Sequence, residues 1–315
     1  MMKKLALIGE CMIELNGEPF GNMRQTYGGD TLNTATYVAR VSSPDDIEVS
    51  YVSALGVDKL SEGMIAHWQA DGINTRWVLR DAERSAGLYL IQLDKQGERT
   101  FLYWRNQSAA RYLLQHPDYP KVLSALKNVD MIYLSGISLA ILPETDRTLL
   151  LEQLREWKKS GVEIAFDSNF RPKLWESLEQ AQQCYQALLP LVDVALVTFD
   201  DESLLWGDVD EQATITRLSA FNIPKIIVKQ GSLGATICEK GTQHFVPTIP
   251  VEQVVDTTSA GDSFNAGFLA GYLQNKALEI CCQQGNQLAG IVIQHKGAII
   301  EKSATTHLRA LFNER

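Results

Sequence analysis

Apolar residues along this chain gather in short runs that alternate with longer amphipathic stretches. The run at 4–9 is continuously apolar, as expected for a strand buried on both faces of a parallel sheet. Further strands are predicted at 49–55, 130–134, 162–167, 193–198 and 225–229, and helices at 59–70, 143–159, 177–188 and 211–220. Strands that alternate with helices indicate an α/β fold, a parallel sheet with helices on both faces.

The periodicity changes in two places in the first third of the chain. Residues 12–27 alternate loosely around two turns, and 87–93 and 99–105 are strand-like runs joined by a turn at 94–97. Together they predict a small sheet separate from the core. We therefore expect one α/β domain over 1–315, with lid strands from about 12–27 and 87–105 that keep water from a reaction.

Composition and missing motifs exclude several function classes. The formal net charge is −9 and no basic stripe occurs, so a nucleic-acid partner is not expected. Apolar runs are only strand-length, which predicts no membrane segment. The five cysteines lack metal or redox spacing, which favours reduced thiols and a cytoplasmic location. The chain has no P-loop, no GxGxxG after its first strand and no GxSxG elbow, so phosphate handling would need another architecture.

The stretch 254–267 carries the clearest chemistry. Small residues lead into apolar positions at helical spacing, and such a helix start offers free backbone N–H groups and a partial positive charge to an anion. Asp262 lies at this same helix start. It could take a proton from a hydroxyl while the amides of Ala260 and Gly261 hold a phosphate, although an aspartate there is also a common helix cap.

The block Asp256–Asp262, followed by Ser263–Gly267, resembles the signature of the ribokinase family of sugar kinases, also called the PfkB type. Ser259 stands where that family usually has a glycine. The resemblance implies a ribokinase-like parallel-sheet core with a small β-sheet lid. It further implies ATP and Mg²⁺ as cofactors, Asp262 as the general base, Ala260 and Gly261 at the transferring phosphoryl group, and Ser259 beside the nucleotide.

A second block, Gly28–Asn33, opens a helical pattern that runs to Val41. A turn plus a helix cap would explain it without any ligand. Glycines also let a ligand reach backbone amides, and Asp30 and Asn33 can read sugar hydroxyls. In the resembled family the corresponding block binds the acceptor sugar. That assigns Gly28, Gly29, Asp30 and Asn33 to the sugar.

Polar residues also follow the predicted core strands at their carboxyl ends, where ligands bind in such sheets. A surface arginine and plain glycine turns are the alternatives there. The resemblance places the following residues beside the nucleotide: Ser168, Asn169, Arg171, Lys229, Gly231, Ser232, Gly234 and Asn286. It also implies that Arg171 reaches the substrate. Glu202 keeps half of a family motif, which leaves an indirect role toward magnesium or a solvated acidic helix start.

Tyr89, Tyr103 and Arg105 stand on the predicted lid hairpin, where aromatic pairs are commonly packing residues. Stretches at 9–15, 103–106, 135–140 and 292–294 are similar to the branch of the family that phosphorylates 2-keto-3-deoxygluconate. An arginine can hold the carboxylate of such a sugar acid bidentately, and Arg105 and Arg171 are the candidates.

The resemblance therefore implies an ATP-dependent kinase for the terminal hydroxyl of this sugar acid. The partners it implies are small molecules, the sugar acid and ATP, and it leaves a homo-oligomer open. A neutral-sugar kinase of the fructokinase or ribokinase type is one alternative. A catalytically silent sensor of ATP or sugar is the other.

Overall fold

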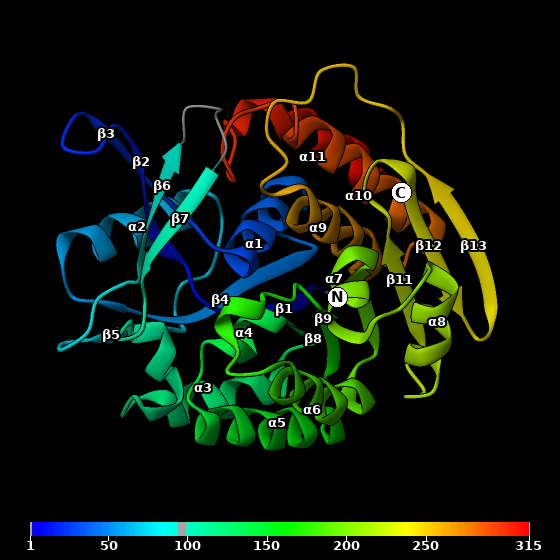
Figure 1. The fold of residues 1–315 in the computed structure, drawn as a ribbon, viewed down its shortest axis with the longest axis horizontal. Helices are drawn as coiled ribbons and strands as arrows, with labels where there is room; N and C mark the ends of the chain where they lie inside the picture. The colour runs from blue at the N-terminus through cyan, green and yellow to red at the C-terminus, as the bar shows by residue number, and fades with distance from the viewer. Residues whose placement is uncertain (1, 94–98, 315) are drawn as a thin grey trace.

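The computed structural model describes residues 2–93 and 99–314, and within them a large sheet has the order β13-β12-β11-β10-β9-β8-β1-β4-β5 (Figure 1). Its strands are β1 (Lys3–Ile8), β4 (Ile47–Gly56), β5 (Val78–Asp81), β8 (Met131–Ser135), β9 (Glu163–Asp167), β10 (Val194–Thr198), β11 (Lys225–Lys229), β12 (Gly234–Glu239) and β13 (Thr242–Pro247). The strands from β5 to β11 pair in parallel, and β12 and β13 add to that edge antiparallel. The predicted parallel sheet is confirmed.

Two hydrophobic cores lie on opposite faces of this sheet. Along β1, Leu5 and Leu7 belong to one core while Ala6 and Ile8 belong to the other. Because the strand is buried on both faces, its sequence is a continuous apolar run rather than an alternating one.

Helices cover both faces, as the alternating pattern predicts (Figure 1). The described helices are α1 (Asp30–Val41), α2 (Lys59–Ala70), α3 (Tyr119–Ala125), α4 (Gly136–Ala140), α5 (Glu144–Lys159), α6 (Leu178–Leu188), α7 (Phe199–Trp206), α8 (Glu211–Ser219), α9 (Ala260–Leu273), α10 (Leu278–Val292) and α11 (Thr306–Phe312). Core residues of α3, α5, α6 and α8 pack on one face, and those of α1, α2, α9, α10 and α11 on the other. Across the described residues, no helix is long and apolar enough to cross a bilayer.

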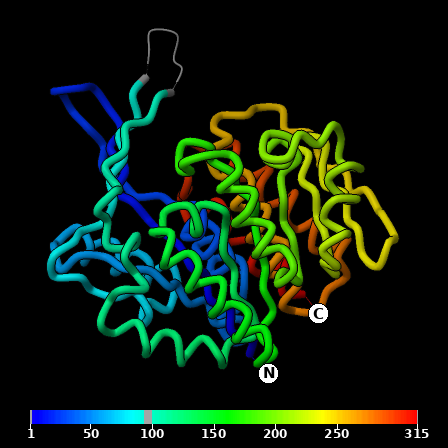
Figure 2. Tube along the Cα trace, turned by 60° about the horizontal axis from the view of Figure 1, so that its bottom comes forward, coloured from blue at the N-terminus to red at the C-terminus, as the bar shows by residue number. Residues whose placement is uncertain are grey.

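A smaller sheet of order β3-β2-β6-β7 stands beside the core and projects from it (Figure 2). It is built from β2 (Met12–Gly17), β3 (Met23–Gly28), β6 (Leu88–Leu93) and β7 (Arg99–Trp104). The hairpins β2–β3 and β6–β7 are antiparallel, and β2 joins β6 in parallel. The separate small sheet is thus confirmed, while its predicted turn at 94–97 lies outside the described residues.

Candidate active site

Two helix starts meet above the carboxyl edge of the parallel sheet. Helix α1 begins at Asp30, directly after the glycine pair, and α9 begins at Ala260, directly after the run of small residues. The Asn33 amide nitrogen, from the first turn of α1, donates a hydrogen bond of 2.9 Å to a carboxylate oxygen of Asp262. The structure therefore brings the two sequence blocks together at Asp262.

Asp262 is buried, with 8% of its surface exposed. The same carboxylate oxygen that accepts from Asn33 also accepts a 3.1 Å hydrogen bond from the Ser259 hydroxyl. Burial, and then the nearby charge of Asp30, raises the pKa of Asp262 to about 7. A carboxyl group whose pKa lies near neutrality can serve as a general base at physiological pH.

Asp30 connects the sugar block with the loop after β9. One of its carboxylate oxygens accepts the Thr31 amide at 2.8 Å, and the other accepts the Asn169 side-chain amide at 2.6 Å. Burial also raises the pKa of Asp30. Asn169 has a backbone φ of +28°, a strained value that its tertiary contacts must hold in place.

The glycine pair is packed against the connections between the two sheets. A side chain at Gly28 would place its Cβ 2.8 Å from the Tyr89 hydroxyl, and one at Gly29 would clash with the backbone carbonyl of Glu10. Close packing of the chain therefore already requires small residues here. It also puts Gly28 and Tyr89, two predicted sugar contacts, side by side.

Two buried glutamates hold two of the predicted sugar-binding residues, Tyr89 on β6 and Arg105 directly after β7. The Tyr89 hydroxyl donates to Glu14, and Arg105 forms an ion pair with Glu10, whose carboxylate also accepts the Ser108 hydroxyl at 2.5 Å. Only 9% of the Arg105 side chain is exposed. Neither glutamate was assigned a role from the sequence alone. Both interrupt an apolar run, and a charged residue in such a run indicates a buried, paired side chain.

Tyr103 and Arg171 are more exposed to solvent than Tyr89 and Arg105, the residues with which the prediction groups them. Half of Tyr103 is exposed, and its ring centroid lies 6.1 Å from that of Tyr89. The Arg171 guanidinium donates to the Phe170 carbonyl at 2.9 Å and lies 3.4 Å from Asp201. Burial raises the pKa of Asp201 to about 6.

Lys229 is buried beneath the start of α9. Its ammonium donates to Asp167 at 3.3 Å and to Asn265 at 3.0 Å. A Cβ built at Gly261 would lie 3.6 Å from that ammonium, which places the charge against the first turn of the helix. Sequence reasoning included Lys229 but not Asn265.

The remaining predicted nucleotide residues occupy three other segments. Gly231 and Ser232 lie in a 3₁₀ turn, and Gly234 follows with a φ of +134° that favours glycine. Asn286, on α10, donates to the Pro247 carbonyl at 3.2 Å. Ser168 is fully buried after β9, and its carbonyl accepts from Tyr185.

Glu202 is not the solvated residue that one interpretation of its motif expected. It is 2% exposed in the first turn of α7, and its carboxylate accepts a 2.6 Å hydrogen bond from Arg217. Arg217 also pairs with Asp208 at 2.6 Å. Burial raises the pKa of Glu202 to about 7. The solvated interpretation is wrong because the helix start packs inward, onto an arginine.

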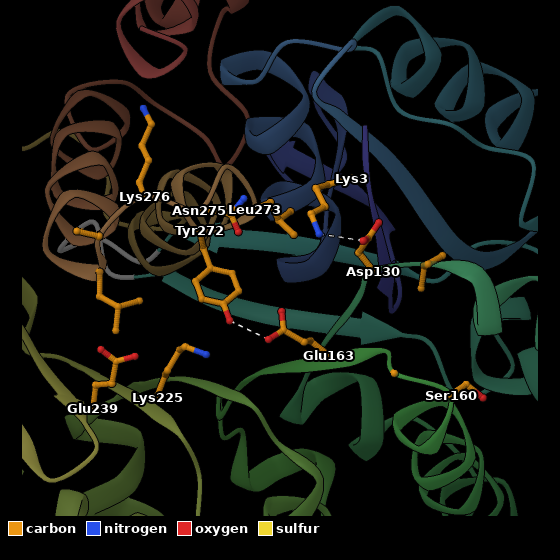
Figure 3. A pocket seen from close by; sticks show the side chains of 14 residues that line it. Lys3, Asp130, Ser160, Glu163, Lys225, Glu239, Tyr272, Leu273, Asn275 and Lys276 are labelled. Atoms are coloured by element: carbon orange, nitrogen blue, oxygen red, sulfur yellow. Dashed lines mark hydrogen bonds and ion pairs between the residues drawn. The ribbon is translucent and has the colours of Figure 1, made fainter. Parts of the chain in front are cut away.

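A surface cavity of about 570 Å³ lies elsewhere, at the opposite edge of the large sheet (Figure 3). Its lining includes Lys3, Glu163 and Lys225, which start their strands. Tyr272 donates to Glu163 there at 2.9 Å. The cavity is therefore separate from the carboxyl edge where α1 and α9 meet.

A parallel sheet that carries two converging helix starts and a buried carboxylate at its carboxyl edge is the architecture of a ribokinase-like phosphotransferase. Residues 2–305 match the model of the pfkB family of carbohydrate kinases, and the chain belongs to that family. The family resemblance and the fold predicted from the sequence are thereby confirmed.

Similar proteins match this chain over nearly its full length. A 2-dehydro-3-deoxygluconokinase of Haemophilus influenzae is 65% identical over 314 residues, covering 99% of this chain and 100% of the relative. A 2-dehydro-3-deoxygluconokinase of Escherichia coli K12 is 43% identical over 307 residues, covering 96% of this chain and 99% of the relative. The solved structure of a 2-dehydro-3-deoxygluconokinase from Thermotoga maritima has a TM-score of 0.81 at 20% identity, and the match covers 98% of this chain and 99% of that structure. At that identity it supports the fold alone.

Proposed function

We propose that this protein transfers the γ-phosphoryl group of ATP to the terminal hydroxyl of 2-keto-3-deoxygluconate, giving 2-keto-3-deoxy-6-phosphogluconate and ADP. The relatives that are 65% and 43% identical over nearly their full length carry the name of this activity. The observation in the structure that supports it most directly is the buried carboxylate of Asp262 at the start of α9.

The chemistry needs a base, an anion site and a fixed geometry. Asp262 accepts the proton of the terminal hydroxyl as that oxygen forms its bond to the γ-phosphorus, and the bond from this phosphorus to the leaving oxygen of ADP breaks. Asn33 orients the carboxylate by its 2.9 Å hydrogen bond. The amides of Ala260 and Gly261 are assigned to the charge on the transferring group, because positioning and charge neutralisation dominate phosphoryl transfer. The Ala260 amide donates to the Thr257 carbonyl at 3.2 Å, so it shares its hydrogen between that carbonyl and the phosphoryl oxygen.

The nucleotide is assigned to the carboxyl edge around β9 and β11. In the proposal, the phosphates lie beside α9 and are bordered by Asn169, Lys229 and the turn that begins at Gly231. Asn286 lies near the base of ATP. Mg²⁺ binds mainly substrate phosphates and water, with one or two carboxylates, and it would neutralise phosphate charge. Asp201 and Glu202, in the first turn of α7, are the acidic candidates on this side, and since Glu202 is held by Arg217 we assign it an indirect role only.

The sugar acid is assigned to the junction between the small sheet and the start of α1, where the glycine pair lies. Gly28, Gly29 and Asp30 contact its hydroxyls, and Tyr89 and Tyr103 cover it from the small sheet, which acts as a lid. Its carboxylate is held by Arg105, with Arg171 as the second cation. Arg105 is already fixed by Glu10, so its orientation is set before the sugar binds.

ADP release measured against a panel of acceptors tests this assignment. The panel holds 2-keto-3-deoxygluconate, 2-ketogluconate, fructose, ribose and a blank without sugar, each with ATP and Mg²⁺. Preference for the keto-deoxy acid supports the proposal. Preference for fructose or ribose would retain Asp262 as the base but remove the carboxylate contact. Binding of ATP or sugar without turnover of any acceptor would support a silent sensor instead.

A further inference from the structure

Four buried side chains form a hydrogen-bonded cluster directly below the start of α9. They are Asp167 at the end of β9, Lys229 at the end of β11, Asn265 on α9 and Tyr133 on β8. Asp167 accepts from Lys229 at 3.3 Å and, through its other oxygen, from Asn265 at 2.9 Å. Asn265 in turn accepts from Lys229 at 3.0 Å and donates to Tyr133 at 3.0 Å.

The burial of this cluster makes its charges consequential. Asn265 and Tyr133 are fully buried, and Asp167 and Lys229 are 3% and 5% exposed. An ion pair at such depth gains little stability over an apolar pair of the same shape, because both charges have lost their hydration. Its field, however, is weakly screened and reaches neighbouring groups. Neutral, well-packed residues would serve packing alone equally well.

The cluster's positive charge lies against the first turn of α9, to which the proposed function assigns the transferring phosphoryl group. The Lys229 ammonium lies 3.6 Å from the position that a Cβ of Gly261 would take, in the first turn of α9. The helix start carries a partial positive charge of its own, and a fixed ammonium beneath it adds to that potential. Asp167 and Asn265 hold the ammonium there through their two oxygens.

We propose that Lys229, held by Asp167 and Asn265, is a positioning residue that strengthens the anion site of α9 for the transferring phosphoryl group without contacting the sugar. The proposal rests on the proposed phosphotransfer. It assigns roles to Asp167 and Asn265, which stabilise the ammonium, and to Tyr133, which orients Asn265. It also predicts that the charge of Lys229, rather than the bulk of its side chain, determines the rate.

The first test is Lys229→Met, which keeps the length of the side chain and removes its charge. We expect kcat to fall about 10- to 100-fold, the cost typical of losing an outer-shell partner, with little change in the KM for the sugar. Lys225→Met is the matched control, because Lys225 starts the same strand at the opposite edge and lies over the Tyr272 ring beside the cavity of Figure 3. The control should keep the wild-type kcat.

The double variant Asp167→Asn with Lys229→Met separates electrostatics from folding, because it leaves no unpaired buried charge. Its kcat should stay low. A wild-type kcat in this variant overturns the proposal even if Lys229→Met alone fails to fold, because the ammonium would then be dispensable.

The pH profile of kcat/KM gives a readout that a purely structural role would not move. The groups that face Asp262 are Asp30, Asp167, Tyr37 and Tyr133, with Lys229 below the same turn. Removing the ammonium alone should move the acidic limb to higher pH, since Asp167 is left unneutralised. The double variant should move it back. An acidic limb at the same pH in all three proteins would overturn the proposal.

The comparison uses whichever sugar the wild-type protein phosphorylates. If that sugar is fructose rather than the keto-deoxy acid, the substrate assignment fails while the test of Lys229 remains valid. If the wild-type protein phosphorylates the keto-deoxy acid and the Lys229→Met and double variants match its kcat, only the inference about Lys229 fails.

Discussion

Asn33 and Asp262 are 229 residues apart in the chain, and their side chains meet in a 2.9 Å hydrogen bond. Each belongs to the first turn of its helix, α1 for Asn33 and α9 for Asp262. The bond therefore joins the segment assigned to the sugar with the segment assigned to the phosphoryl group. Asn33 and Ser259 both donate to the same carboxylate oxygen of Asp262. The other carboxylate oxygen takes part in neither of these two hydrogen bonds.

Asp262→Asn should retain the fold and lose turnover. An amide keeps the size of the side chain but cannot accept the hydroxyl proton, so kcat should fall by ~10²–10⁴. Steady-state kinetics measures the loss, and circular dichroism with a urea titration checks the fold. Near-normal turnover in a folded variant would show that another group accepts the proton.

The value of kcat/KM should fall as the pH is lowered below about 7. The pKa of Asp262 is raised to about 7, so below that pH the carboxyl group is protonated and cannot act as a base. We expect kcat/KM to fall about tenfold for each unit below this pKa. A profile of kcat/KM from pH 5 to 9 checks it. A flat profile down to pH 5 would contradict the raised pKa or the role of the base.

Arg105→Met should remove the preference for an acidic sugar. Losing one charge-assisted contact costs about 2–4 kcal/mol, roughly 30- to 1000-fold in kcat/KM. The change must be specific, so the ratio of kcat/KM for 2-keto-3-deoxygluconate to that for fructose is the quantity to measure. If the protein is a neutral-sugar kinase, this ratio will not change.

The ion pair with Glu10 complicates that variant, because Arg105→Met leaves a glutamate that is 3% exposed without its cation. Glu10→Gln alone and Glu10→Gln with Arg105→Met are therefore the matched controls. The double variant should show the same change in substrate preference as Arg105→Met. If it recovers the preference for the acid, the effect of Arg105→Met came from the unpaired glutamate.

Breaking the ion pair between Arg40 on α1 and Asp71 should lower the free energy of unfolding more than breaking an exposed ion pair. Both side chains are buried, and two hydrogen bonds of 2.9 and 3.0 Å join them. Asp71→Ala leaves the Arg40 charge buried and should cost about 3–5 kcal/mol in the free energy of unfolding. Urea denaturation measures it. The exposed pair Lys159–Glu156 is the control, and Glu156→Ala should leave the midpoint unchanged. Equal midpoints for both variants would contradict this.

The core of the fold was accessible from the sequence because its signals are local. Helix α2 has the bounds that the pattern predicts, and Asp58 caps it by accepting the Ser61 amide at 2.9 Å. The antiparallel pair β12–β13 was missed. Its outer strand is mostly exposed and carries no run of apolar residues, so the regular alternation stops at β11.

The site was predictable only as far as short motifs extend. The blocks around Asp262 and Asn33 were found because their small residues and helical spacing are contiguous in the chain. The partners of these residues were not. Glu10 meets Arg105 across 95 positions and Asp167 meets Asn265 across 98, and no local pattern encodes such pairings. How each assigned residue acts stays a prediction until the variants are measured.

The connections between the two sheets have a mechanical consequence. Glu10 lies on the link from β1 to β2, Gly29 on the link from β3 to α1, and Arg105 directly after β7. Gly29 packs against the backbone of Glu10, and Arg105 pairs with the Glu10 carboxylate. A rotation of the small sheet must therefore displace the groups assigned to the sugar. Sugar affinity and the angle of that sheet would be thermodynamically linked, so a variant that alters one will alter the other.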